Sequence, residues 1–117
     1  MMNFIEHLFQ LLNTVLPSRV SYGTNTVDVA EVEVYPFIVY QEISDRVQTY
    51  ADNKTLVRMI SYQITLVTKT KDPLIEEQLE AALYQSGMNY QMITEYVNED
   101  HSVNRVYEIK QEEIKHE

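Results

Sequence analysis

The sequence contains no cysteine and no tryptophan, and it has only 2 glycines and 3 prolines among 117 residues. A chain without cysteine has neither a disulfide framework nor a thiolate nucleophile. Its two glycines, Gly23 and Gly87, stand alone, which excludes the glycine-rich loops that bind phosphate groups. The apolar run FIEHLFQLLNTVL is too short to span a bilayer and includes Glu6 and His7. We therefore expect no membrane anchor and no signal peptide.

Positive charge is also scarce. There are 9 Lys and Arg residues and 18 Asp and Glu residues, which gives a formal net charge of −9 and a pI near 4.7. The basic residues are dispersed along the chain. Because nucleic acid carries a dense negative charge, we expect no sequence-specific nucleic-acid binding. A composition of 44% hydrophobic and 23% charged residues is typical of a folded protein, and the length indicates a single domain over residues 1–117.

Two segments have the apolar spacing of helices. Residues 3–16 carry a wide apolar stripe, with Asn3 at the N-cap position and a proline directly after the last turn. A second helix is predicted to begin at Asp72 and Pro73, to present a narrow apolar face, and to end at Gly87. The first stripe predicts a helix packed on the core, and its width leaves room for contact with a neighbouring subunit.

Short alternating segments predict strands, and these are 19–23, 36–50, 56–70, 90–97 and 103–114. The turn ADNK joins the second and third strands into an antiparallel hairpin, whose end, residues 44–55, is expected to project past the core. NEDHS joins the last two strands into another hairpin. Residues 24–34 are acidic and without periodicity, which predicts either a disordered loop or an ordered arm.

The predicted elements follow the order α-β-β-β-α-β-β. Runs of strands interrupted by single helices favour an α+β fold. We expect a two-layer sandwich, in which an antiparallel sheet of about four to five strands carries both helices on one face.

Residues for catalysis, cofactor binding or metal binding do not converge in the sequence. The three histidines, His7, His101 and His116, lack the spacing of zinc ligands and are expected on the surface. Several carboxylates of the last hairpin either gather for acid–base chemistry or form a solvated acidic face, and the scarcity of apolar neighbours favours the second interpretation. They are Glu95, Glu99, Asp100, Glu108 and Glu112.

Tyrosine is frequent, with 9 residues in the chain. Without a basic groove these side chains are poor candidates for nucleotide stacking. We interpret them as half-buried interface anchors, notably Tyr40, Tyr50, Tyr62, Tyr90, Tyr96 and Tyr107.

Three stretches together resemble a known family. They are YPFIVYQEIS at 35–44, RMISYQITLVTKT at 58–70 and PLIEEQLEAAL at 73–83. With the N-terminal helix and the strand that ends near SYG, the chain looks like the small tail-terminator, or tail-completion, proteins of long-tailed bacteriophages and prophages. The resemblance covers approximately residues 3–114. The acidic stretch 24–34 departs from the pattern, because such proteins often run directly from the glycine into the proline strand.

The resemblance implies a structural role without an active site or a cofactor. Tail terminators form rings, commonly hexameric, at the head-proximal end of the tail tube. They halt polymerisation of the tube and dock onto the head connector. The expected partners are therefore copies of this chain, a tail-tube protein and a head-connector protein, with DNA passing through the ring. The expected location is the tail or neck of the virion, assembled in the bacterial cytoplasm.

The segments least needed by a core are the candidate contacts to neighbouring subunits or to the tube. In the projecting hairpin and the acidic stretch, and on the first helix, these residues are Arg46, Gln48, Tyr50, Asp52, Lys54, Asp28, Glu31, Glu33 and Phe9. A second reading of the same sequence is a small soluble α+β protein-binding or regulatory module that dimerises through a sheet edge. An enzyme that uses clustered carboxylates or tyrosines is the third.

Overall fold

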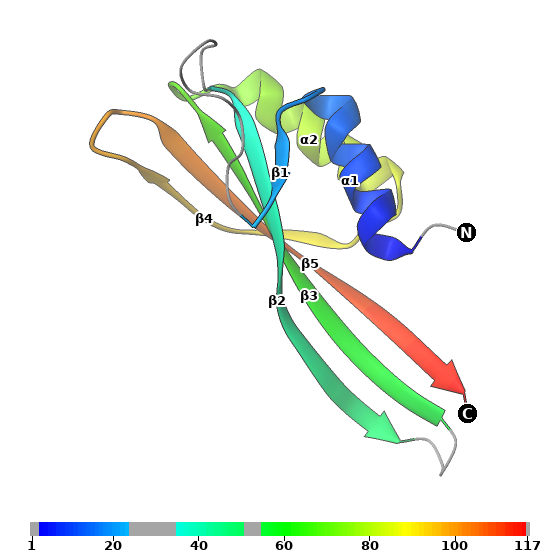
Figure 1. The fold of residues 1–117 in the computed structure, drawn as a ribbon. Helices are drawn as coiled ribbons and strands as arrows, with labels where there is room; N and C mark the ends of the chain where they lie inside the picture. The colour runs from blue at the N-terminus through cyan, green and yellow to red at the C-terminus, as the bar shows by residue number, and fades with distance from the viewer. Residues whose placement is uncertain (1–2, 24–34, 51–54, 117) are drawn as a thin grey trace.

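Two helices lie on one face of a five-stranded sheet in the computed structural model of the chain (Figure 1). The structure describes residues 3–23, 35–50 and 55–116, and of 45–50, 55–56 and 114–116 it describes the backbone alone. The elements follow the predicted order, and the α+β class is confirmed. The stretch 24–34 and the turn 51–54 lie outside the described residues.

Capping residues mark the ends of both helices. Helix α1 (Phe4–Val15) is capped by Asn3, whose side chain accepts a hydrogen bond from the backbone N–H of Glu6 at 2.9 Å. Helix α2 (Pro73–Gln85) is capped in the same way by Asp72. It ends before Gly87, which takes a positive φ of 81°, a conformation that residues with a side chain rarely adopt.

The sheet is mixed. Its strands are β1 (Val20–Tyr22), β2 (Phe37–Tyr50), β3 (Thr55–Thr68), β4 (Tyr90–Val97) and β5 (Val103–His116), in the spatial order β1-β2-β3-β5-β4. Strand β1 pairs parallel to β2, and every other neighbouring pair is antiparallel. The expectation of a wholly antiparallel sheet was therefore wrong for β1.

The core fills the space between the helices and the sheet. It is formed by leucines of both helices and by alternate residues of the three central strands. Its fully buried side chains are Leu8, Leu12, Ile38, Ile64, Leu66, Leu79, Leu83, Tyr107 and Ile109. Burying apolar area in this layer is the main stabilising contribution to such a fold.

The sheet is longer than the layer of helices. Strands β2, β3 and β5 continue together beyond α1 and α2, as Figure 1 shows, and the molecule measures 53 × 27 × 25 Å. Pairing of β2 with β3 continues to Tyr50 and Leu56, and pairing of β3 with β5 continues to Thr55 and His116. The projecting end, which we call the arm (residues 45–50, 55–59 and 111–116), is therefore three-stranded, whereas the sequence predicted a two-stranded hairpin.

Candidate interaction surfaces

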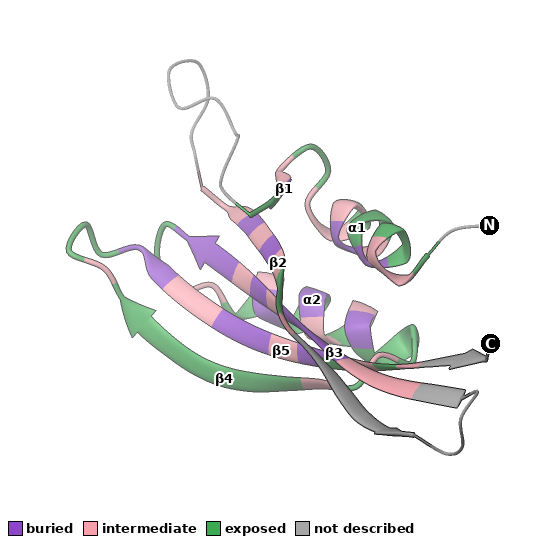
Figure 2. Ribbon diagram, turned by 60° about the horizontal axis from the view of Figure 1, so that its bottom comes forward, coloured by how far each residue is buried: buried purple, intermediate pink, exposed green. Residues whose placement is uncertain are grey.

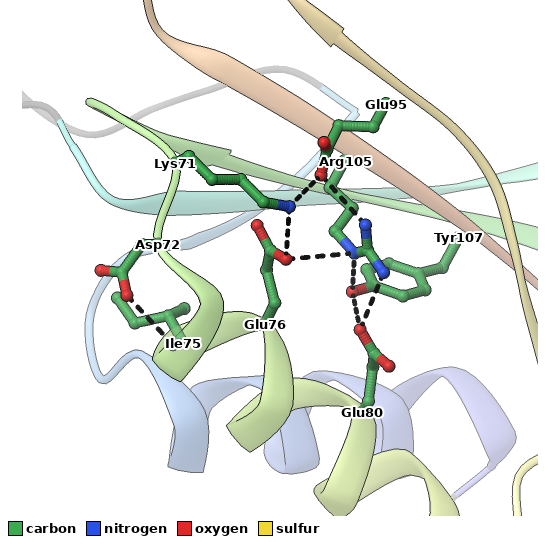
Figure 3. A network of polar contacts seen from close by, with 8 residues as sticks. All are labelled: Lys71, Asp72, Ile75, Glu76, Glu80, Glu95, Arg105 and Tyr107. Carbon is green, nitrogen blue, oxygen red and sulfur yellow. Dashed lines mark hydrogen bonds and ion pairs between the residues drawn. The ribbon is translucent and has the colours of Figure 1, made fainter.

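A network of charged side chains fastens α2 to the last two strands (Figure 3). Lys71 Nζ lies 2.7 Å from Glu76 Oε1 and 2.7 Å from Glu95 Oε1. The guanidinium of Arg105 lies 3.0 Å from Glu95 Oε1 and 3.2 Å from Glu80 Oε2. Because Glu76 and Glu80 are four residues apart, they share one side of α2 and face the sheet together. The network joins α2, β4, β5 and the segment before α2.

Tyr107 of β5 also belongs to this network. Its buried hydroxyl donates to Glu80 Oε2 at 2.8 Å and accepts from Arg105 Nε at 2.7 Å. Burial, followed by the hydrogen bond to Glu80, raises the pKa of Tyr107 well above its usual range, so the phenol stays protonated. The side chain therefore serves as a neutral donor on β5.

The charges of the network are mutually stabilised. Burial alone lowers the pKa of Arg105, but its hydrogen bonds to Tyr107 and Glu95 outweigh burial and raise the pKa overall. The hydrogen bond from Lys71, and then that from Arg105, hold the pKa of Glu95 below its usual value. Glu76, Glu80 and Glu95 each have a nitrogen of Lys71 or Arg105 within 4 Å. These contacts hold the β4–β5 hairpin against α2.

The turn between β4 and β5 is ordered around Asp100. Ser102 donates to Asp100 Oδ1 through its hydroxyl at 2.6 Å and its backbone N–H at 3.0 Å. The Tyr35 hydroxyl, which comes from the start of β2, donates to Asp100 Oδ2 at 2.7 Å. These bonds, with the Ser102 hydroxyl first, lower the pKa of Asp100 to about 2.

We expect the carboxyl of Asp100 to titrate near pH 2 when followed by carboxyl NMR. Ser102→Ala should raise this pKa more than Tyr35→Phe does, because the Ser102 hydroxyl is the larger cause. A pKa lowered in the folded state stabilises the fold above the unfolded pKa, and that contribution disappears as the pH falls through the folded pKa. The turn should therefore loosen between about pH 4 and pH 2. A midpoint near 4 in the unmodified protein would contradict the turn geometry.

A groove opens between α1 and the β1 edge of the sheet. Its volume is about 630 Å³, and it is lined by Ile5, Glu6, Phe9, Gln10, Tyr22 and Tyr40. Three aromatic rings meet there: Tyr22 contacts Tyr40 edge-on at 5.1 Å between centroids, and Phe9 lies 6.3 Å from Tyr40. Tyr22 is 53% exposed. Glu6 is the single charged residue among the lining side chains, so the groove is an apolar surface open to a partner.

At the opposite edge of the sheet, β4 is exposed along nearly its whole length (Figure 2). Apolar side chains at its surface are Met92, Ile93, Tyr96 and Val97. No Lys, Arg or Pro occurs between Tyr90 and Val97, although such residues commonly protect an edge strand from pairing. A register shift at Ile93 is the one protective irregularity in β4.

The structure places the predicted interface residues unevenly. Phe9 lies on α1 and lines the groove. Arg46, Gln48 and Tyr50 belong to the arm through their backbones in β2. The remaining predicted residues lie outside the described residues, and they are Asp28, Glu31, Glu33, Asp52 and Lys54. The sequence prediction omitted the lining residue Tyr22, and of β4 it named only Tyr90 and Tyr96, as tyrosine anchors.

The tyrosines and carboxylates match the predictions in part: Glu95, Glu99, Asp100 and Glu112 are exposed, in agreement with a solvated acidic face. Tyr62 and Tyr107 are buried in the core, so they are not interface anchors of the folded monomer. Tyr40 is buried but its ring lines the groove, Tyr90 is half-buried, and Tyr96 is exposed. Glu95 joins the cations of the network and Asp100 joins the turn, so these two acids do not share a site. The other three predicted carboxylates do not join them in either cluster.

Within the described part of the chain, no three His, Cys, Asp or Glu side chains are placed to hold a metal ion. No helix among these residues is long and apolar enough to cross a membrane. His7 and His101 are exposed. No protein-family model matches the sequence, and no curated protein is similar to it at a significant level.

Proposed function

We propose that the protein is a structural protein of a bacteriophage or prophage tail. In this role copies of the chain form a ring, with six subunits as the resemblance implies, that terminates the tail tube and joins it to the head connector. The ring belongs to the neck of the virion and is assembled in the host cytoplasm. DNA passes through the ring, and the net charge of −9 keeps phosphate groups from adhering to its wall.

The observation that carries this proposal is the three-stranded arm. Strands β2, β3 and β5 continue past both helices, and none of the arm residues whose side chains the structure describes, 57–59 and 111–113, belongs to the core. A paired extension beyond the helices is a cost in a monomer, since it orders backbone that no helix layer covers. A neighbouring subunit or the tube would supply that layer. The order of elements also agrees with the family that the sequence resembles.

One observation favours a second candidate, the protein-binding module that dimerises through a sheet edge. The free edge of β4 is apolar, and antiparallel pairing of β4 with itself would give a symmetric dimer. Native mass spectrometry over a range of concentrations separates the candidates. A strict dimer at all concentrations favours the module, and a larger closed ring favours the tail protein.

Inactivating the gene in the phage or prophage that carries it tests the proposal directly. We expect electron micrographs of induced lysates to show tail tubes of uncontrolled length and heads without tails. Supplying the protein from a plasmid should restore complete particles. Complete particles with tails of normal length in the uncomplemented strain would rule out a tail-terminating role.

We predict that shortening the arm preserves the fold but abolishes tail completion. Val47 pairs with Arg58, and Arg58 pairs with Glu113, so one cut shortens all three strands in register. Residues 48–57 are replaced by Asn-Gly, which favours a two-residue hairpin turn, and the chain ends after Glu113. Circular dichroism should show a cooperative thermal transition, and plasmid complementation should fail. The control ends after Glu113 but keeps residues 48–57, and it should restore at least part of the particles. Full complementation by the trimmed protein would show that the arm is dispensable.

A further inference from the structure

The outer edge of β1 has backbone groups in position to extend the sheet. Two hydrogen bonds fix the parallel ladder: the Ile38 N–H donates to the Arg19 carbonyl, and the Gly23 N–H donates to the Tyr40 carbonyl, both at 2.9 Å. In a parallel ladder alternate residues of a strand bond to the same neighbour. The backbone groups of Val20 and Tyr22 therefore point away from β2. Among the described strands, β1 has a neighbour on one side only.

The side chains beside this edge fit an apolar strand. Tyr22 lies opposite Tyr40 in the ladder and contacts its ring on the helix side of the sheet, where Phe9 also lies. A strand added to β1 would place every second side chain over these rings. Met92 and Val97 lie on the helix side of β4. Their partners in β5, Tyr107 and Val103, are each two residues from Arg105, which contacts Glu80 of α2. Methionine packs well against aromatic rings.

Strand direction and charge both allow the two edges to meet. From the pairings, β1, β2 and β5 run one way and β3 and β4 run the other. A second copy that is brought alongside by rotation about an axis parallel to the strands presents its β4 antiparallel to β1. Between molecules of net charge −9 most contacts are repulsive. These two edges are exceptions, since Glu95 is the sole charge in β4 and is held by Lys71 and Arg105.

We propose that β4 of one copy pairs antiparallel with β1 of the next, so that Met92 or Val97 covers the groove beside Tyr22. The contact joins two different surfaces, so it repeats around a ring and leaves no free edge. This inference rests on the proposed ring, and it names the surfaces that build it. It also gives each exposed edge of the described sheet a partner.

Cysteine trapping tests the contact cleanly, because the chain has no cysteine of its own. Tyr22→Cys is combined with Met92→Cys in one chain, and with Val97→Cys in another. Both proteins are oxidised in two settings, first after purification and then in lysates where tails assemble. The products are separated without reductant. We expect a ladder of dimers and higher oligomers for at least one of the two chains. Mixing the single variants Tyr22→Cys and Met92→Cys, or Tyr22→Cys and Val97→Cys, should give dimers of unlike chains only.

Tyr96→Cys with Tyr22→Cys is the matched control. Tyr96 accepts a hydrogen bond from Asn104 on the opposite face of β4, so its thiol would point away from the groove and give no ladder. Two results overturn the inference: no cross-linking above this control in either setting, or dimers of the Met92→Cys variant with itself, which indicate symmetric β4 pairing. The inactivation experiment reports on tail function independently, so a failed edge contact and a failed tail function are distinguishable.

Discussion

Arg105→Met should destabilise the fold by about 1–3 kcal/mol, because it removes one partner from a half-buried ionic network. The Arg105 side chain is 18% exposed and that of Glu76 is 8% exposed. Arg105 contacts Glu80 and Glu95 directly, and its Nε donates to Tyr107. Methionine keeps the aliphatic stem, so the loss reports on the guanidinium. Urea unfolding at pH 7 measures the change in the free energy of unfolding.

Lys110→Met is the control for this substitution. Lys110 is 62% exposed, and its Nζ lies 3.8 Å from Glu108. An exposed pair of this kind contributes roughly 0–1 kcal/mol, so the variant should unfold almost as the unmodified protein does. Equal effects of Arg105→Met and Lys110→Met would mean that the network does not fasten the hairpin. Adding Glu80→Gln to Arg105→Met should recover part of the loss, since the Glu80 carboxylate loses the guanidinium that pairs with it and the amide carries no charge.

The cost of Arg105→Met should also depend on pH. Lys71 and Arg105 hold the pKa of Glu95 below its usual value, so the stabilisation from Glu95 is present above the unfolded pKa and is lost as the pH falls through the folded pKa. Once the carboxyl groups are protonated, they no longer form ion pairs with the guanidinium of Arg105. The difference between Arg105→Met and the unmodified protein should therefore shrink from pH 7 towards acidic pH, and a constant difference would contradict an electrostatic origin.

Leu79→Ala should destabilise the fold by about 3 kcal/mol, because it empties a fully buried position of α2. The free energy of unfolding of a domain is typically about 5–15 kcal/mol, so this loss is a large fraction of the total. The melting temperature should fall by roughly 10 °C. Differential scanning calorimetry measures both quantities.

Leu74→Ala separates burial from helix propensity. Leu74 lies on the same helix, is 64% exposed, and undergoes the same chemical change. Leucine and alanine differ little in helix propensity, so Leu74→Ala should change stability by less than about 0.5 kcal/mol. If both variants lost the same stability, the helix rather than the core contact would be the cause.

Much of the fold follows from local sequence signals. Asn3 and Asp72 mark helix starts because their side chains satisfy N–H groups within the same turn. The hairpin of β4 and β5 is short-range as well. What joins these pieces is not local. Strand β1 pairs parallel to β2, and the extra residue Ile43 shifts the register between β2 and β3, so the strict alternation predicted along β2 is interrupted there.

The network escaped prediction for the same reason. Its members come from four segments, and no spacing in the sequence connects Lys71 or Glu80 with Arg105. A partial signal existed, since Glu76 and Glu80 share one helix face and Arg105 and Tyr107 share one strand face. Of the surfaces, Phe9 was predictable as the exposed margin of a wide apolar stripe. That β4 lies at an edge of the sheet follows from the strand order, which the sequence does not specify.

The place of β5 between β3 and β4 also has consequences for folding kinetics. The hairpins β2–β3 and β4–β5 are local and can form within about 1–10 μs. The seam between them pairs Thr68 with Val103 at its nearest point and Thr55 with His116 at its farthest, across the whole of α2 and β4. Contacts between residues so distant along the chain carry a large loop-closure entropy cost, so they form late in folding. Closing this seam should therefore limit the folding rate, and the same step completes the arm.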